Sequence, residues 1–161
     1  MAKRARSYFL FKSEPSVYSI DDLVSDGRTM WDGVRNYQAR NLLRDAMKPG
    51  DLGLFYHSSC DAIGVAGVCR VCSDPYPDPT QFDPKSKYHD PGSSEDDPRW
   101  FLVDVEPVER FAEVVSLARL KADGALAGMM VLQRGSRLSV QPVERKHFAR
   151  VLKLAGATTK P

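Results

Sequence analysis

The stretch MWDGVRNYQAR, residues 30–40, combines side chains that could hold a ligand with side chains that begin a helix. Asn36 is a typical N-cap, because its side-chain oxygen can accept a hydrogen bond from a backbone N–H of the first helical turn. Helix entry does not explain the neighbouring Trp31, Gly33 and Arg35. These residues therefore raise the question of a surface built to bind something.

Catalytic constellations are the first alternative for such a surface. A nucleophilic hydrolase holds its nucleophile against a base, yet no GxSxG turn occurs, and His57 and Ser58 are neighbours in a predicted strand. Neighbouring strand side chains point to opposite faces, so these two cannot form that pair. The glycine loops GxGxxG and GxxxxGK[ST] are also missing from the sequence. We therefore predict no catalytic residues and no nucleotide cofactor.

Metal sites are equally unsupported by the spacing of the usual ligands. Cys69 and Cys72 fall on opposite faces if both lie in one regular strand, so we interpret them as structural thiols. The three histidines are scattered without ligand spacing. The acidic stretch after residue 74 is too mobile, as a predicted loop, to hold a fixed acid and base pair. We expect no metal and no enzymatic activity.

Length and composition limit the class of protein. A chain of 161 residues and 18.0 kDa fits one domain with its own core. No apolar run reaches the roughly 20 residues of a membrane span, and residues 1–11 lack the features of a secretory signal. The odd number of cysteines, three, suits a reducing compartment. We expect no membrane association and a cytoplasmic location.

The net charge of +2 hides a segregated distribution. Residues 74–109 carry 3 basic and 10 acidic side chains, whereas residues 110–161 carry 10 basic and 3 acidic ones. Either the acidic segment is an ordinary solvated loop, or the basic segments form a face for phosphates while the acidic loop lies elsewhere.

Hydrophobic periodicity predicts the elements that must position these residues. Strands are predicted over 7–12, 100–108 and, as a hairpin, over 51–58 and 62–72. Helices are predicted over 20–26 between Ser19 and Gly27, from Asn36 to the Pro49–Gly50 stop, weakly over 116–123, and from Pro142 to Gly156. One or two strands are expected around Gly135, and a long loop over 74–98. The irregular mixture favours an α+β domain with a curved, mainly antiparallel sheet or small barrel.

Several fragments, in their order along the chain, resemble the EVE domain family: FKSEP, WDGVRNYQARN, FYHS, GVAGV, YPDPTQFD, YHDP, DPRW and RLSVQPV. The resemblance covers nearly the whole chain and implies a PUA-like fold, a small open β-barrel with peripheral helices. It divides the sequence into a basic N-terminal extension (1–6), a single EVE domain (7–156) and a loose C-terminal tail (157–161).

The resemblance also implies a function. Members of the family are associated with modified cytosine in DNA, and related modules accept an exposed or flipped base in an aromatic-walled pocket. The implied protein is a non-catalytic reader whose partner is nucleic acid, with DNA favoured over RNA. It would lie in the cytoplasm of a bacterium or the nucleus of a eukaryote. An RNA reader and a sensor of a small molecule or nucleotide metabolite are the alternatives.

Site residues follow from the same resemblance. The implied base pocket consists of Lys12, Ser13, Glu14, Trp31, Asp32, Gly33, Asn36, Tyr56, His57, Ser58, Trp100, Leu138 and Ser139. The implied phosphate ligands are Arg35, Arg40, Arg44 and Arg134.

The expected roles differ within that set, and each has a structural alternative. Trp31 would be the main stacking wall, since aromatic stacking contributes roughly 1–3 kcal/mol per base, or it would cover the core. Glu14 would accept a hydrogen bond from an exocyclic amine. Asn36 would read a base edge or only cap its helix. Tyr56 and His57 alternate along a strand, so one could lie in the core and the other in the pocket.

Overall fold

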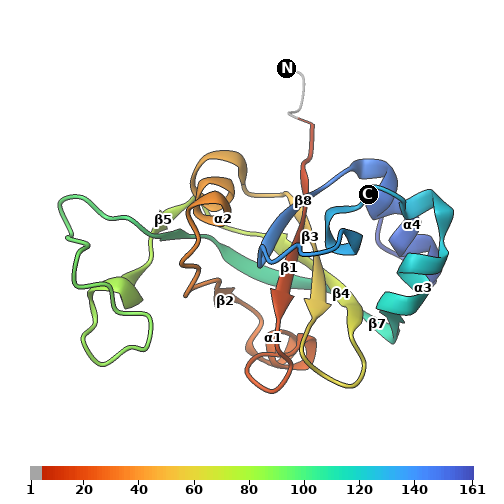
Figure 1. The fold of residues 1–161 in the computed structure, drawn as a ribbon, viewed down its shortest axis with the longest axis horizontal. Coiled ribbons are helices and arrows are strands. Elements are labelled where there is room, and N and C mark those ends of the chain that lie inside the picture. The colour runs from red at the N-terminus through yellow and green to blue at the C-terminus, as the bar shows by residue number, and fades with distance from the viewer. Residues whose placement is uncertain (1–4) are drawn as a thin grey trace.

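A curled six-stranded sheet forms the centre of the molecule in the computed structural model, which describes residues 5–161 (Figure 1). Residues 1–4 of the predicted N-terminal extension lie outside the described residues. The strands are β1 (Tyr8–Ser13), β2 (Thr29–Met30), β3 (Leu52–His57), β4 (Gly64–Val71), β5 (Tyr76–Pro77), β6 (Phe101–Leu102), β7 (Asp104–Ser116) and β8 (Val140–Val143).

Helical segments surround this sheet. The α-helices are α1 (Ile20–Asp26), α2 (Tyr37–Asn41), α3 (Leu117–Ala122) and α4 (Arg145–Ala155). A π-helical turn over Leu42–Ala46 continues α2, and 3-10 turns cover Pro79–Phe82, Gly124–Leu126 and Met130–Leu132.

The sheet order is β2-β7-β4-β3-β1-β8, and β5 pairs with β6 in a separate two-stranded ladder. β1 and β3 run parallel, while the other pairs are antiparallel. The mainly antiparallel, curved sheet with few helices confirms the predicted α+β class. The parallel register places Ser13 beside His57, so that β1 and β3 end at the same edge of the sheet.

Strand alternation divides the core between the two faces of the sheet. Phe9 and Phe11 of β1 point to the face covered by α1 and α2, where Trp31 also packs. Tyr8 and Leu10 point to the opposite face, which α3 and α4 cover. The face of each aromatic side chain therefore decides whether it can reach a site near Trp31.

The helices and strands next to Trp31 were predicted correctly from local sequence signals. Ser19 forms a capping box with Asp22, and Gly27 ends α1 in the left-handed conformation at φ 74°. The side chain of Asn36 accepts a hydrogen bond from the N–H of Ala39, which confirms the predicted N-cap. The predicted hairpin is also present as β3 and β4.

Two predictions about the C-terminal part were wrong. Pro142 does not begin the last helix but lies in β8, and α4 begins at Arg145. β8 is an edge strand, where a residue without an N–H is tolerated. The expected loose tail is held instead, because the N–H groups of Thr158 and Thr159 donate to the carboxylate of Glu109 at 3.0 and 2.8 Å.

The segment predicted as a long loop is an ordered arm, which we define as residues 74–100. It projects from the sheet on the side away from α3 and α4 (Figure 1). Its start pairs with β6 through Tyr76 and Leu102, and Asp78 caps the turn over Pro79–Phe82. The arm returns to the body of the domain near Gly33, where the ring of Tyr88 lies against the backbone.

Candidate functional site

A cavity of about 550 Å³ opens where β1 ends, and we call it the β1 cavity. Three segments form most of its wall: the end of β1 with the following turn, the segment from β2 to residue 35, and the returning arm. The lining residues are Lys12, Ser13, Glu14, Val17, Tyr18, Thr29, Met30, Trp31, Asp32, Gly33, Val34, Arg35, Lys87, Tyr88 and Ser139. Its volume lies within the roughly 300–1,000 Å³ typical of ligand sites.

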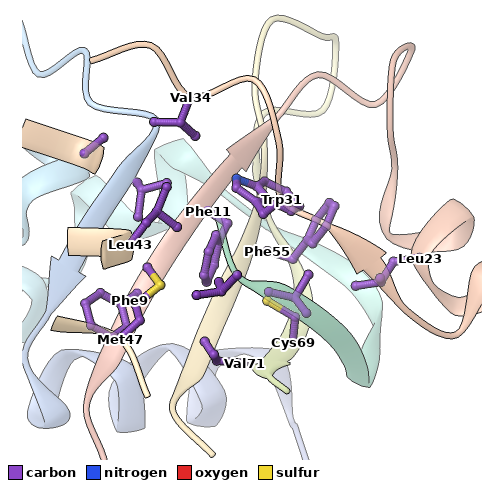
Figure 2. Packing of buried hydrophobic residues seen from close by; sticks show 14 of the residues in the cluster. Phe9, Phe11, Leu23, Trp31, Val34, Leu43, Met47, Phe55, Cys69 and Val71 are labelled. Carbon is purple, nitrogen blue, oxygen red and sulfur yellow. The ribbon is translucent and has the colours of Figure 1, made fainter. Parts of the chain in front are cut away.

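Trp31 belongs to both the core and the cavity. Only 8% of the residue is exposed, and its ring makes edge contacts with Phe11 and Phe55 at centroid distances of 5.1 and 5.6 Å. Figure 2 shows Trp31 between these two rings above the sheet. Most of the indole therefore belongs to the core, and its remaining surface faces the cavity, so its role as a stacking wall stays a prediction.

The turn after β1, residues 14–18, supplies a second aromatic wall. The carbonyl of Glu14 accepts hydrogen bonds from the N–H groups of Val17 and Tyr18 at 2.9 and 2.8 Å. Ser13 donates its hydroxyl to the carbonyl of Tyr18. The Tyr18 hydroxyl donates to Asp26, and burial together with this bond raises the pKa of Tyr18 to about 12. Tyr18 is therefore held in place as a neutral ring beside the cavity.

The arm closes another side of the cavity around Gly33. Gly33 has φ 79°, and a Cβ there would lie 2.5 Å from the ring of Tyr88, so this approach requires glycine. The N–H of Gly33 donates to the buried Asp78 at 2.8 Å. Arg35 donates to the Tyr88 carbonyl at 2.7 Å and to Asp78 at 3.1 Å. These contacts fix Tyr88 against the cavity.

Charged groups of both signs face the β1 cavity. Burial lowers the pKa of Lys12, whose Nζ donates to the Ser136 carbonyl over a long 3.4 Å. Burial, and then repulsion from Asp78, raise the pKa of Asp32. The Asp32 carboxylate receives no hydrogen bond from another residue within 5–161, and Lys87 is exposed at the mouth. The cavity therefore offers unused donors and acceptors.

The structure brings part of the predicted set together. The predicted residues that line the β1 cavity are Lys12, Ser13, Glu14, Trp31, Asp32, Gly33, Ser139 and the phosphate candidate Arg35. The lining residues that were not predicted from the sequence are Val17, Tyr18, Thr29, Met30, Val34, Lys87 and Tyr88. Tyr88 begins the fragment YHDP, which was a signal for this part of the arm, although nothing local placed it near Gly33.

The predicted residues at the end of β3 and directly after it, Tyr56, His57 and Ser58, do not line the cavity. Tyr56 is 4% exposed and packs on the opposite face of the sheet, with the second core cluster. His57 contacts Phe55 and accepts a hydrogen bond from the N–H of Ile20 at 3.1 Å. Ser58 lies closer, since its N–H donates to the Ser13 carbonyl, but its side chain is outside the lining. Parallel pairing with β1 brings the backbone at the end of β3 to the edge of the cavity, but the side chains of these three residues do not point into it.

Three other predicted pocket residues have structural roles. Asn36 caps α2. Trp100 is 6% exposed and stacks on Tyr37, with its indole N–H donating to Asp90 at 2.7 Å. Leu138 packs against the first core cluster. None of the three lines the β1 cavity.

Of the predicted phosphate ligands, three arginines already bind protein acceptors, and the fourth lies outside the cavity lining. Every guanidinium nitrogen of Arg35 donates to a protein acceptor, so Arg35 braces the arm. Arg40 donates to the Arg99 carbonyl, Arg44 pairs with Asp45, and the exposed Arg134 lies outside the lining. At the start of α2, the N–H of Ala39 already donates to the side chain of Asn36.

Within 5–161, no group of three or more His, Cys, Asp or Glu side chains is placed to hold a metal ion. No helix in this part of the chain is long and apolar enough to cross a membrane.

Comparison with known proteins gives consistent matches across the chain. The model of the EVE domain matches residues 7–154. Human thymocyte nuclear protein 1 is 42% identical over 170 residues, covering 94% of this chain and 75% of that protein.

Solved structures agree with this match. A crystal structure of a protein from Pseudomonas putida has a TM-score of 0.90 and 48% identity, covering 92% of this chain and 99% of that one. Human THYN1 protein in complex with 5-methylcytosine containing DNA has a TM-score of 0.85 and 42% identity, covering 96% and 99%.

Proposed function

The chain belongs to the EVE domain family, and from this premise we propose that it binds DNA containing a modified cytosine and holds that base in the β1 cavity. The PUA-like fold implied by the sequence is confirmed by its likeness to human THYN1 protein. That relative is solved with 5-methylcytosine containing DNA, which supports the choice of ligand.

The observation that carries the proposal is the composition of the cavity wall. Tyr18, Trp31 and Tyr88 give ring surfaces on several sides, and Lys12 and Asp32 keep polar atoms available between them. A flipped base needs this combination of flat apolar walls and hydrogen-bonding groups for its edge. The arm, held by Arg35, keeps the third ring in position.

We assign the base edge to groups with unused hydrogen-bonding capacity. The Asp32 carboxylate accepts from the exocyclic amine of cytosine, and Glu14 is the second acidic group of the lining. Lys12 donates to the acceptors on the same edge, which its long contact with Ser136 leaves possible. Uracil and thymine present a carbonyl where cytosine has its amine, so Asp32 would disfavour both.

Lys87 replaces the arginines as the proposed phosphate ligand. Its Nζ lies 5.0 Å from the Tyr88 ring centroid, and it is exposed at the cavity mouth. A phosphate beside the flipped nucleotide would reach it without breaking an existing ion pair. Because such contacts release counterions, affinity should fall as salt rises.

We propose that the domain acts by binding alone. The cavity lining contains no histidine or cysteine, and the Ser13 hydroxyl donates to a carbonyl. A hydroxyl used in this way lacks the general base that would activate it. Incubation with a modified oligonucleotide should leave the mass of that oligonucleotide unchanged.

The test is a fluorescence-anisotropy titration of matched oligonucleotides carrying cytosine or 5-methylcytosine, at two salt concentrations. Asp32→Asn should weaken binding of the modified DNA about tenfold, the loss expected for one hydrogen bond to a charged group. Asp61→Asn is the matched control, because Asp61 is an exposed acid outside the cavity lining.

Equal, weak binding of both oligonucleotides, unchanged in Asp32→Asn, would contradict the proposal and favour a metabolite as ligand. Tighter binding of methylated RNA than of DNA would instead identify an RNA reader. Trp31→Ala is a poor first variant, because this tryptophan packs in the core.

A further inference from the structure

The rim of the β1 cavity carries exposed apolar side chains that the bound base would not need. The large hydrophobic residues exposed within 5–161 are Val17, Val24, Met30 and Tyr37. Val17 and Met30 both line the cavity, although they are 61% and 43% exposed. They stand at its mouth, where a partner that enters the cavity must pass.

We infer that Val17 is a wedge that enters the base stack of duplex DNA at the position from which the cytosine has been flipped, with Met30 packing beside it. This inference rests on the proposed function. It adds the surface that holds the duplex open, which is separate from the cavity that holds the base.

The turn that carries Val17 is built to keep the side chain projecting. Pro15 fixes one backbone angle of the turn, and the Glu14 carbonyl accepts from both Val17 and Tyr18. The Ser13 hydroxyl ties the end of the turn back to β1. A wedge must resist the restacking of the bases, and a turn braced in this way loses little conformational freedom on insertion.

The charges around the turn favour contact with bases over contact with phosphates. Residues 13–20 contain one acid, Glu14, and no lysine or arginine. The basic groups of the lining, such as Lys12 and Lys87, come from β1 and the arm instead. The phosphates would therefore be held by Lys87 of the arm, while the uncharged tip of the turn meets the interior of the duplex.

The apolar character of Val17 and Met30 agrees with that of known wedges, of which methionine is one. Proteins that kink DNA insert apolar side chains between base steps and partly unstack them, which costs a few kcal/mol per step. An apolar side chain that fills the vacated place recovers contact area that water would otherwise occupy. Single-stranded DNA needs no such help, because its base is already unpaired.

The experiment compares duplex and single-stranded oligonucleotides carrying one 5-methylcytosine, titrated against wild type, Val17→Ala and Val24→Ala. Val24 is the matched control, because it is the same residue type, 48% exposed on α1, and outside the cavity lining. We expect Val17→Ala to lose about tenfold in affinity for the duplex, equivalent to about 1.4 kcal/mol. Its affinity for the single strand should fall by a clearly smaller factor, and Val24→Ala should match wild type on both.

A second readout follows the duplex itself. 2-Aminopurine placed beside the modified cytosine should brighten when wild type binds and should brighten less with Val17→Ala at saturating protein. The double variant Val17→Ala/Met30→Ala should show the smallest signal. All these positions are exposed, so the variants should keep the fold.

Each other outcome overturns a specific statement. An equal loss on duplex and single strand would make Val17 an ordinary cavity wall, and no loss on either would remove it from the interface. Both results would leave the proposed function intact. Failure of wild type to prefer 5-methylcytosine in either form would overturn the proposed function and the wedge with it.

Discussion

Trp31 and Trp100 are buried to nearly the same extent, at 8% and 6% exposure, yet they belong to regions with different roles. Trp31 packs on the sheet between Phe11 and Phe55 and still borders the β1 cavity. Trp100 lies at the end of the arm and stacks on Tyr37, with the two ring centroids 4.9 Å apart. The extent of burial alone therefore does not separate a tryptophan that borders the cavity from one that holds the arm in place.

The polar surroundings do separate the two tryptophans. Around Trp100, Gln81 accepts from the Trp100 N–H and donates to its carbonyl, and Asp90 accepts from the indole. Around Trp31, Asp32 has no hydrogen bond from another residue of 5–161. A saturated network holds structure together, whereas a cavity with unused polar groups can receive a ligand.

The largest expected effect comes from truncating the cavity wall. Trp31→Ala should lower the free energy of unfolding by about 3–5 kcal/mol, because it leaves a large void between Phe11 and Phe55. Urea unfolding would measure it. Trp31→Phe is the control and should lose less, since a ring remains in the cluster. A loss below about 1 kcal/mol in Trp31→Ala would show that the indole is not core.

The next effect would come from the contact that joins the two regions. Asp78 is fully buried and accepts from Gly33, Arg35 and Thr80. Asp78→Asn should lower the free energy of unfolding by about 2–3 kcal/mol. This loss is small for a broken buried ion pair, because Arg35 is partly exposed. The substitution should also free the arm, so proteolysis within 83–97 should become faster. Asp83→Asn, at an exposed turn, should change neither measurement.

A smaller effect is expected at Trp100. Trp100→Phe keeps a ring on Tyr37 and removes the hydrogen bond to Asp90, which should cost about 1–2 kcal/mol in thermal unfolding. Affinity for modified DNA should stay within about twofold of wild type. A large loss of affinity with normal stability would mean that Trp100 contacts the DNA. The two tryptophans would then not differ in role as described above.

Most elements near Trp31 could be predicted because their signals are local. The alternation of Phe9 and Phe11, the Ser19 cap and the Asn36 cap depend on a few neighbouring residues each. Pro142 was misplaced because its tolerance depends on β8 being an edge strand, which is a property of the whole sheet.

The candidate site divides in the same way. The part on the end of β1 and around Trp31 was predicted because one family fragment carries each segment. Tyr88 and Lys87 were missed because the arm reaches Gly33 through contacts of Arg35 and Asp78 that lie far apart in the sequence. Tyr56, expected in the pocket, packs on the opposite face of the sheet, and the face of a β3 side chain depends on how β3 pairs with β1.

The last prediction concerns pH. It tests whether Asp32 is the group that distinguishes the β1 cavity from the surroundings of Trp100. Burial raises the pKa of Asp32, Asp78 raises it further, and Arg35 and Lys87 oppose this. If the ionised carboxylate accepts from the cytosine amine, affinity falls as pH drops through this raised pKa, so the loss begins at a higher pH than an ordinary carboxyl would give. Asp32→Asn should bind more weakly but with a flatter pH profile, measured by anisotropy in one buffer series at constant salt. Affinity that rises as the pH is lowered would instead require a protonated Asp32 that donates to the ring nitrogen of cytosine, which would reverse the proposed direction of this hydrogen bond.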